Sequence, residues 1–306
     1  MRVKDKFEKF GRDLTNFVFL GQKIYFGKTT YTGIKIGIQS NFVSYTYDES
    51  WSTSLQLIKE INPQVVIVYR PEVYDTEFLT ILRQEFITVA YFTEPLPFFG
   101  FEAEFDLIRR YAPFEIYDMS NCDFNVTYNP VTCKILNEKS KIILTHPIPV
   151  SDDIFVRKSD LSDSKGGIFL GRVTKKRNEY LMPLKHKFDL TVLDHGELNE
   201  SFYKKHIFAV NLHSDSYPNF ENRIFYHMAQ SLLVLSEPII PDYGLEDGKH
   251  YLGFETPERL KEIVLDISNN QYKYYEVANS GFTFAQEFST SKFLKKLTQA
   301  IKIELD

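Results

Sequence analysis

The sequence has little cysteine, since Cys122 and Cys133 are the only two among 306 residues. They form no Cys-x-x-Cys pair and show no Cys/His spacing of the kind that holds a metal, so no metal site is predicted. No run of about 20 apolar residues occurs, which predicts no membrane span. The charged N-terminus lacks the apolar core of a signal peptide. We therefore expect a protein of the reduced cytoplasm.

The chain also lacks an excess of positive charge. It has 36 Lys and Arg residues but 41 Asp and Glu residues, which gives a net charge of −5. Nucleic-acid binding normally requires a basic surface, so we expect no nucleic-acid partner. Lysines flank Phe7 and Phe10 near the N-terminus. Asp5 and Glu8 interrupt them, so this segment predicts at most weak peripheral contact with an anionic membrane.

Several common catalytic motifs are missing from the chain. No Gly-x-Gly-x-x-Gly follows a predicted strand, and no Walker loop, Gly-x-Ser-x-Gly elbow or His-Glu-x-x-His is present. These absences disfavour the dinucleotide-binding, P-loop, serine-hydrolase and zinc-protease classes in their usual forms.

The pattern that is present alternates short apolar, β-branched runs with helical periodicity, which predicts a mostly parallel α/β protein. The length favours about two domains. In the first half we expect helices near residues 55–61 and 78–82. The expected strands there are 34–38, 65–69, 87–92, 124–128 and 142–145.

A domain boundary is predicted after His146–Val150, where two prolines at one-residue spacing favour an extended connection before a polar stretch. We therefore divide the chain into an N-terminal domain, 1–150, and a C-terminal domain, 151–306. The last helix, which starts near Ser289, can return to pack on the first domain. The strands expected in the second domain are 167–171, 190–193, 208–212 and 232–235, with a helix opening at Pro257.

Cationic residues follow the first strand of the second domain. Arg172, Lys175, Lys176 and Arg177 place four positive charges within six positions after Gly171. Ligands of parallel α/β proteins bind at the carboxyl ends of the strands, and guanidinium and ammonium groups suit phosphates. The segment therefore predicts a phosphate site, and the alternative interpretation is a solvated basic turn.

A second polar segment lies between residues 217 and 229. Asn222, Arg223 and Tyr226 fall on faces that adjoin an apolar stripe at four-residue spacing, and the first turns of a helix favour an anion. His195 and His213 end the two strands before this segment. Three successive strand ends thus carry polar residues toward one crevice, whereas the alternative is an amphipathic surface helix. The stripe consists of Phe220, Ile224, Met228 and Leu232.

The segment 168–297 resembles the C-terminal domain of the CgeB-like glycosyltransferases, relatives of glycosyltransferase family 1 with a GT-B fold. The resemblance implies an α/β architecture of two Rossmann-like domains with a central cleft. It also implies transfer of a sugar from a UDP- or GDP-linked donor, with no further cofactor and no metal. The pieces that carry it are Phe169-Leu-Gly-Arg172, Val210-Asn-Leu-His213, Asn222-Arg-Ile-Phe-Tyr226, Ala229-Gln-Ser231 and Leu233-Val-Leu-Ser-Glu237.

The resemblance also implies roles for individual residues. Arg172, together with Lys176 or Arg177, would neutralise the donor diphosphate, and Arg223 would assist. Tyr226 stands where the family has the glutamate that holds the donor ribose, and Pro218 stands at the matching upstream position of retaining relatives. These departures leave open whether the transfer is retaining or inverting, and whether it occurs at all.

An inverting transfer needs a base for the acceptor hydroxyl, and Glu94 is our candidate because it follows the strand 87–92. Neighbouring prolines and phenylalanines would raise its pKa. A loop carboxylate or a helix cap is the alternative interpretation. Asp48, Glu49 and Glu102 are rival bases, Trp51 and Phe101 are candidates for stacking on a sugar, and His146 is expected to be structural.

Three functions follow from this reading. The first is a metal-independent GT-B glycosyltransferase in glycan or surface-polysaccharide synthesis, with a glycan, a lipid-linked sugar or a protein as acceptor. The second is a non-catalytic module of the same fold that binds a sugar or a partner, motivated by Tyr226 and Pro218. The third is a nucleotide-sugar epimerase, which no sequence feature favours.

Overall fold

The computed structural model describes residues 2–11, 13–45, 51–94, 112–130, 133, 136, 138, 140–158, 164–193, 200–213, 219–240 and 242–306. The chain forms two compact units. Unit 1 comprises Met1–Asp153 and Phe288–Asp306, and unit 2 comprises Ile154–Glu287. The division falls close to the expected boundary at residue 150, and the final helix belongs to unit 1.

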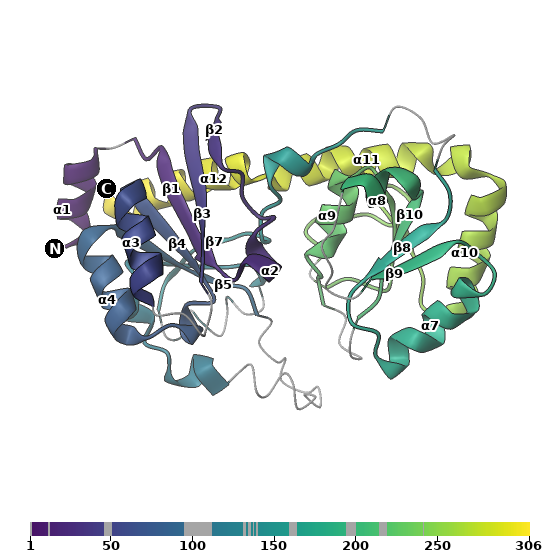
Figure 1. Ribbon diagram of the computed structural model, residues 1–306, viewed down its shortest axis with the longest axis horizontal. Helices are drawn as coiled ribbons and strands as arrows, with labels where there is room; N and C mark the ends of the chain where they lie inside the picture. The colour runs from purple at the N-terminus through teal and green to yellow at the C-terminus, as the bar shows by residue number, and fades with distance from the viewer. Residues whose placement is uncertain are drawn as a thin grey trace. The chain divides into compact units, whose positions relative to one another are not determined.

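Unit 1 contains a seven-stranded sheet with the order β2-β3-β1-β4-β5-β6-β7. Its strands are parallel, except that β2 and β3 form an antiparallel hairpin at one edge (Figure 1). The strands are β1 (Asn16–Gly21), β2 (Gly33–Lys35), β3 (Ile38–Ser44), β4 (Val65–Tyr69), β5 (Ile87–Phe92), β6 (Phe124–Thr127) and β7 (Ile142–Thr145).

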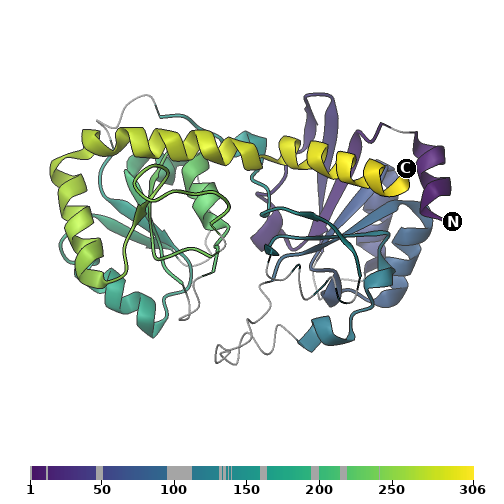
Figure 2. The same ribbon diagram turned by 180° about the vertical axis from the view of Figure 1, so that it is seen from behind.

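The central strands of unit 1 are apolar on both faces because helices cover both. Every residue of β4 and β5 is buried. Phe17 and Phe19 of β1 pack in the cluster that includes α12 (Thr290–Leu305), whereas Val18 and Leu20 pack with α3 (Trp51–Ile61) and α4 (Thr76–Glu85). Figures 1 and 2 show α12 behind the sheet and α3 and α4 in front of it. The short helices α1 (Val3–Phe10) and α2 (Lys23–Phe26) also belong to this unit.

The return of α12 to unit 1 is fixed by buried aromatic packing and by hydrogen bonds at its start. Phe293 is fully buried, and its ring centroid lies 5.4 Å from that of Tyr91. The N–H and the hydroxyl of Ser291 both donate to the carboxylate of Asp152. His146 packs against Phe293, and its burial lowers its pKa to about 4, so it is neutral at pH 7. His146 is therefore a structural residue of this core.

Unit 2 contains a five-stranded parallel sheet with the order β12-β11-β10-β8-β9. Ile168 and Ala209 pack with Tyr203 of α8, whereas Phe169 and Val210 pack with α7 and α10. Helix α11 lies along α9. The elements are β8 (Gly167–Leu170), α7 (Lys175–Lys185), β9 (Leu190–Leu193), α8 (Glu200–Lys205), β10 (Phe208–Asn211), α9 (Arg223–Ala229), β11 (Leu233–Ser236), β12 (Leu252–Gly253), α10 (Pro257–Asn269) and α11 (Tyr275–Ala285).

The structure corrects two expectations about secondary structure. The single strand expected over 34–38 is wrong, because Ile36 (φ 52°) and Gly37 (φ 75°) turn the chain between β2 and β3. The helix expected through the apolar stripe is short, since α9 spans only Arg223–Ala229. Phe220 and Leu232 are buried outside it. In the described part of the chain, no helix has the length and apolar character needed to cross a bilayer.

Candidate functional site

Two guanidinium groups, from Arg177 of α7 and Arg223 of α9, lie close to Gly171, which directly follows β8. This glycine is buried and has φ 138°, a conformation that disfavours side chains. A Cβ atom at this position would lie 2.7 Å from Nη1 of Arg223 and 3.6 Å from Nη1 of Arg177. The close approach of Arg223 and the backbone conformation thus favour glycine after β8, whereas Arg177 lies at an ordinary contact distance.

Arg177 links the carboxyl ends of two strands of unit 2. It lies in the first turn of α7, where the Thr174 hydroxyl caps its N–H. Its Nε and Nη2 donate to the carbonyl of Leu212 after β10, at 3.0 and 2.8 Å, and its Nη1 donates to the carbonyl of Arg172 at 2.9 Å. The residue is only 4% exposed. Arg177 therefore joins the segments after β8 and β10 by hydrogen bonds, and its buried charge lies next to the ends of these strands.

Glu221 lies between the two arginines. Its Oε2 is 2.9 Å from Nη2 of Arg223, and its Oε1 is 3.7 Å from Nη2 of Arg177. Arg223 also donates to the carbonyl of Leu170 at the end of β8. Burial disfavours the charged form of Glu221, but the ion pair and hydrogen bond with Arg223 outweigh it and lower its pKa. Glu221 is thus ionised at neutral pH and neutralises part of this cationic cluster.

A second carboxylate, Glu237, organises the neighbouring strand ends. Its Oε1 lies 2.9 Å from Nζ of Lys176, and its Oε2 accepts the backbone N–H of His213 at 2.6 Å. The Nε2 of His213 lies 2.7 Å from the carbonyl of Pro238, so Nε2 is the donor. Burial lowers the pKa of His213, which makes it a neutral side chain at pH 7. The network therefore extends from β8 through β10 to β11.

The structure brings together most, but not all, of the residues expected to bind a donor. Gly171, Lys176, Arg177, His213 and Arg223 form one network of contacts at the carboxyl ends of β8, β10 and β11. The side chain of Arg172 is exposed, and its carbonyl is what enters the network. His195 lies outside the described residues.

Two expected donor residues of the α9 segment lie apart from these contacts. Asn222 is the N-cap residue of α9, but its side chain caps no N–H of the helix. Tyr226 is half-buried, and its ring packs against Tyr203 at 5.5 Å between centroids. The helix itself has only seven residues, so the cations rather than a helix terminus would bind an anion here.

Sequence reasoning missed Glu221 and Glu237 as partners of the cations. Glu237 directly follows β11, the same kind of position that identified Arg172 and His213. Glu221 lies two residues before Arg223. The positional signal was therefore present, but only the distances show which cation each carboxylate contacts.

In unit 1, the candidate base Glu94 belongs to a cluster at the carboxyl ends of β4 and β5. The Nε of Arg70 lies 3.4 Å from Oε1 of Glu94 and 3.2 Å from Oε1 of Glu72. The Glu94 side chain is 13% exposed and that of Glu72 is fully buried. Burial raises the pKa of Glu72 to about 7. Sequence reasoning missed Arg70 and Glu72.

The other candidates on the acceptor side are placed as follows. Trp51 is half-buried and packs on Phe78, with ring centroids 5.6 Å apart, so it belongs to the core under α3. The rivals Asp48, Glu49 and Glu102, the candidate Phe101 and the apolar neighbours of Glu94 from residue 95 onward lie outside the described residues.

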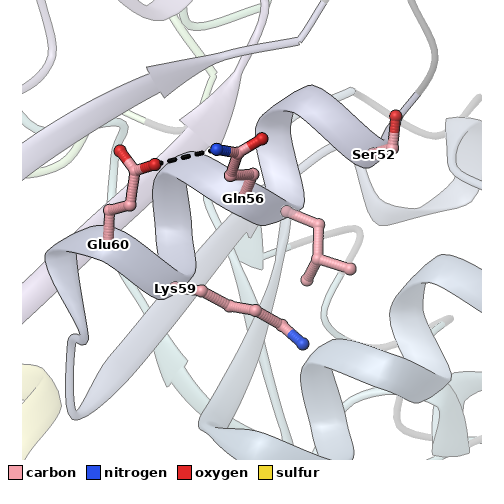
Figure 3. A pocket seen from close by; sticks show the side chains of 5 residues that line it. Ser52, Gln56, Lys59 and Glu60 are labelled. Atoms are coloured by element: carbon pink, nitrogen blue, oxygen red, sulfur yellow. Dashed lines mark hydrogen bonds between the residues drawn. The ribbon is translucent and has the colours of Figure 1, made fainter.

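A shallow hollow on α3 is a weaker candidate (Figure 3). It is lined by Ser52, Leu55, Gln56, Lys59 and Glu60. Gln56 donates to Glu60 at 3.0 Å, and Lys59 pairs with Glu85 at 2.6 Å. These contacts are typical of a solvated helix face. Among the described residues, no group of three or more His, Cys, Asp or Glu side chains is placed to hold a metal ion.

No protein-family model matches the chain, and no curated protein matches it in sequence. Solved structures do match its fold. HepE from Anabaena, crystallised with UDP and glucose, superposes with a TM-score of 0.55 at 9% identity over 95% of this chain and 100% of its own. Sucrose-phosphate synthase from Thermosynechococcus elongatus superposes with a TM-score of 0.56 at 11% identity over 94% and 98% of the two chains.

TarM is a further match, with a TM-score of 0.55 at 12% identity over 80% of this chain. The match spans 57% of the TarM chain. These structural neighbours are GT-B glycosyltransferases. The likeness, with the two sheets of parallel strands, confirms the α/β GT-B fold expected from the sequence. It does not test the CgeB-like resemblance.

Proposed function

We propose that this protein is a GT-B glycosyltransferase that transfers a sugar from a UDP- or GDP-linked donor, which unit 2 binds. The observation that carries the proposal is the network at the carboxyl ends of β8, β10 and β11. There, Lys176, Arg177 and Arg223 are held by two carboxylates and by strand-end carbonyls. Cations at strand ends of a parallel sheet suit an anionic ligand.

A diphosphate would bind by replacing carboxylates as partners of the cations. The side chains of Lys176 and Arg223 are 33% and 14% exposed, so both can meet a ligand, whereas Arg177 is buried and supplies a fixed charge. Arg172 is exposed and can turn toward the phosphates. Each charge-assisted hydrogen bond contributes about 1.5–3 kcal/mol. Four cations would thereby offset the diphosphate charge without a metal ion.

The solved structures support this reading, because HepE was crystallised with UDP, with UDP and glucose, and with UDP-glucose. Membership of the CgeB-like group is part of the proposal and rests on the motifs between residues 168 and 297. On the acceptor side, we assign the general base to Glu94, next to Arg70. A glycan, lipid-linked or protein acceptor on the cytoplasmic side fits the same proposal.

The test is nucleotide binding by calorimetry with UDP and GDP. Arg223→Ala removes an ion-pairing guanidinium at Gly171, and we expect it to weaken binding about 10- to 100-fold, the loss of one to two charge-assisted bonds. Arg172→Ala should weaken binding less. Arg259→Ala is the matched control, because Arg259 is an exposed arginine of α10 that pairs with Glu262. Unchanged affinity in both Arg172→Ala and Arg223→Ala would disprove the site.

A second candidate is a non-catalytic module of the same fold. It is favoured by Tyr226, whose ring packs on Tyr203 at the position where the family has a carboxylate. A panel of nucleotide sugars would then show binding without transfer or hydrolysis. Turnover that appears in Tyr226→Glu would identify the protein as an enzyme that has lost activity.

A further inference from the structure

Arg70 pairs with two carboxylates in unit 1, and its backbone has an unusual conformation. It directly follows β4 and adopts φ 54° and ψ 60°, a left-handed conformation that costs a non-glycine residue about 1–3 kcal/mol. Its N–H donates to the carbonyl of Tyr91 in β5, and Pro71 fixes the next residue at the start of a 3₁₀ turn (Pro71–Val73). This strained backbone directs the guanidinium of Arg70 toward both Glu72 and Glu94.

The side chain of Glu72 is a buried carboxyl group that is hydrogen-bonded at only one of its two oxygens among the described residues. Its side chain is 0% exposed, its Oε1 accepts from Nε of Arg70, and its Oε2 is buried with no hydrogen-bond partner among the described residues. A buried, unpaired carboxylate oxygen is costly, so it calls for an explanation beyond packing. The cost is lowest when the group carries a proton, and burial accordingly raises the pKa of Glu72 to about 7.

Among the described residues, the titratable and charged groups that interact with Glu72 come from three segments. Arg70 precedes it, Glu94 follows β5, and Tyr117 lies before the 3₁₀ turn Met119–Asn121. Tyr117 donates to Sγ of Cys122. Burial raises the pKa values of both Tyr117 and Cys122, so neither ionises near neutrality. Among these described groups, Glu72 is therefore the one whose pKa burial raises to about 7.

We propose that Glu72 is a positioning residue that controls the proton affinity of Glu94 through their shared partner, Arg70. With Glu72 protonated, Glu94 lies beside the guanidinium of Arg70 without a competing negative charge on Glu72. When Glu72 ionises, it competes for the same guanidinium and repels the Glu94 carboxylate, which makes Glu94 a stronger base. The consequence for catalysis rests on the proposed function, in which Glu94 deprotonates the acceptor.

The coupling can be measured without substrate, on the full chain with ¹³C-labelled glutamate carboxyl groups titrated by NMR from pH 5 to 9. We expect the carboxyl of Glu72 to titrate near pH 7 and that of Glu94 to show an inflection at the same pH. Glu72→Gln should remove this inflection. Glu85→Gln is the matched control, because Glu85 is a half-exposed carboxylate of α4 paired with Lys59. An inflection of Glu94 that persists in Glu72→Gln, or a Glu72 that does not titrate between pH 5 and 9, overturns the proposal.

Kinetics then test the consequence for transfer. In the wild type, kcat/KM should rise about tenfold between pH 6 and 8, as for one group titrating near pH 7. Glu72→Gln should flatten the profile, whereas Glu72→Asp and Glu85→Gln should keep it. An unchanged profile in Glu72→Gln contradicts the proposal. If no nucleotide sugar gives transfer, the proposed function fails, while the NMR titration still decides the coupling on its own.

Discussion

Individual residues at the strand ends of unit 2 have two roles. They connect the loops by hydrogen bonds, and they place charge at one edge of the sheet. Arg177 illustrates this, because three of its nitrogens bond to carbonyls of Leu212 and Arg172 while its charge stays within reach of Glu221. A residue that only shaped the loops would not need to be charged. One that only bound a ligand would not need to be 4% exposed.

Gly171→Ala tests the close packing of the arginines at the end of β8. The new methyl group would meet Nη1 of Arg223 at 2.7 Å, and φ 138° adds backbone strain. We expect a loss of about 1–3 kcal/mol in the free energy of unfolding. We also expect weaker nucleotide binding, because the guanidinium must move. Chemical denaturation and calorimetry measure the two effects.

The control is Gly248→Ala, also in unit 2. Gly248 has φ 77°, but no heavy atom lies within 4 Å of the place that a new methyl group would take, so this variant tests strain without a clash. It should lose stability and keep nucleotide affinity. Equal affinity in both variants would mean that the position of Arg223 does not matter for binding.

At the scale of helices and strands, buried parallel strands were the most predictable part of the chain. The expected strands 65–69 and 87–92 are confirmed because their unbroken apolar runs reflect helices on both faces. The strand β1 was missed, since Phe17–Leu20 is a four-residue apolar run that periodicity alone cannot assign. The β2–β3 hairpin was read as one strand because Ile34, Ile36 and Ile38 alternate as in a strand.

The candidate sites were predictable only in part, for a related reason. Position after a strand identified Arg172, His213 and Glu94 from sequence, because strand ends of a parallel sheet share one edge. Contacts between pairs of side chains were not predictable. The contact of Arg70 with Glu72 depends on the left-handed backbone conformation of Arg70, which no sequence pattern indicates. Whether these residues bind a donor or move a proton stays a prediction.

The hairpin turn offers a test of backbone strain at the element scale. Ile36 has φ 52° in a two-residue turn with Gly37, where asparagine is favoured and a β-branched residue is strained. The side chain is 71% exposed, so little packing is lost on replacement. Ile36→Asn should raise the free energy of unfolding by about 0.5–1 kcal/mol.

Ile34→Asn is the control for this hairpin. Ile34 is 72% exposed but lies within β2, where asparagine is disfavoured. Chemical denaturation should place Ile34→Asn at or below the wild type and Ile36→Asn above it. The reverse order would show that the isoleucine at the turn is not strained.

At the scale of the whole molecule, the chain passes from unit 1 to unit 2 and back again, so unit 1 is closed by its last nineteen residues, Phe288–Asp306. Four buried side chains of α12 enter the core of unit 1 beside β1, β4 and β5. Unit 1 therefore depends for its stability on residues that are far away in sequence from its first 153 residues. The buried side chains are Phe293, Leu294, Leu297 and Ile301.

Phe293→Ala should therefore loosen unit 1 and leave unit 2 unaffected. The ring is 0% exposed and stacks with Tyr91 at 5.4 Å, so we expect a loss of about 3–5 kcal/mol in the free energy of unfolding of unit 1. Hydrogen exchange followed by mass spectrometry should show faster exchange in β1, β5 and α12, with protection in β8 and β10 unchanged. Ile303→Ala, on the same helix but 67% exposed, should leave both units unchanged. Equal loss of protection in β8 and β10 would mean that the two units unfold as one cooperative body, and the division into separately stabilised units would then be wrong.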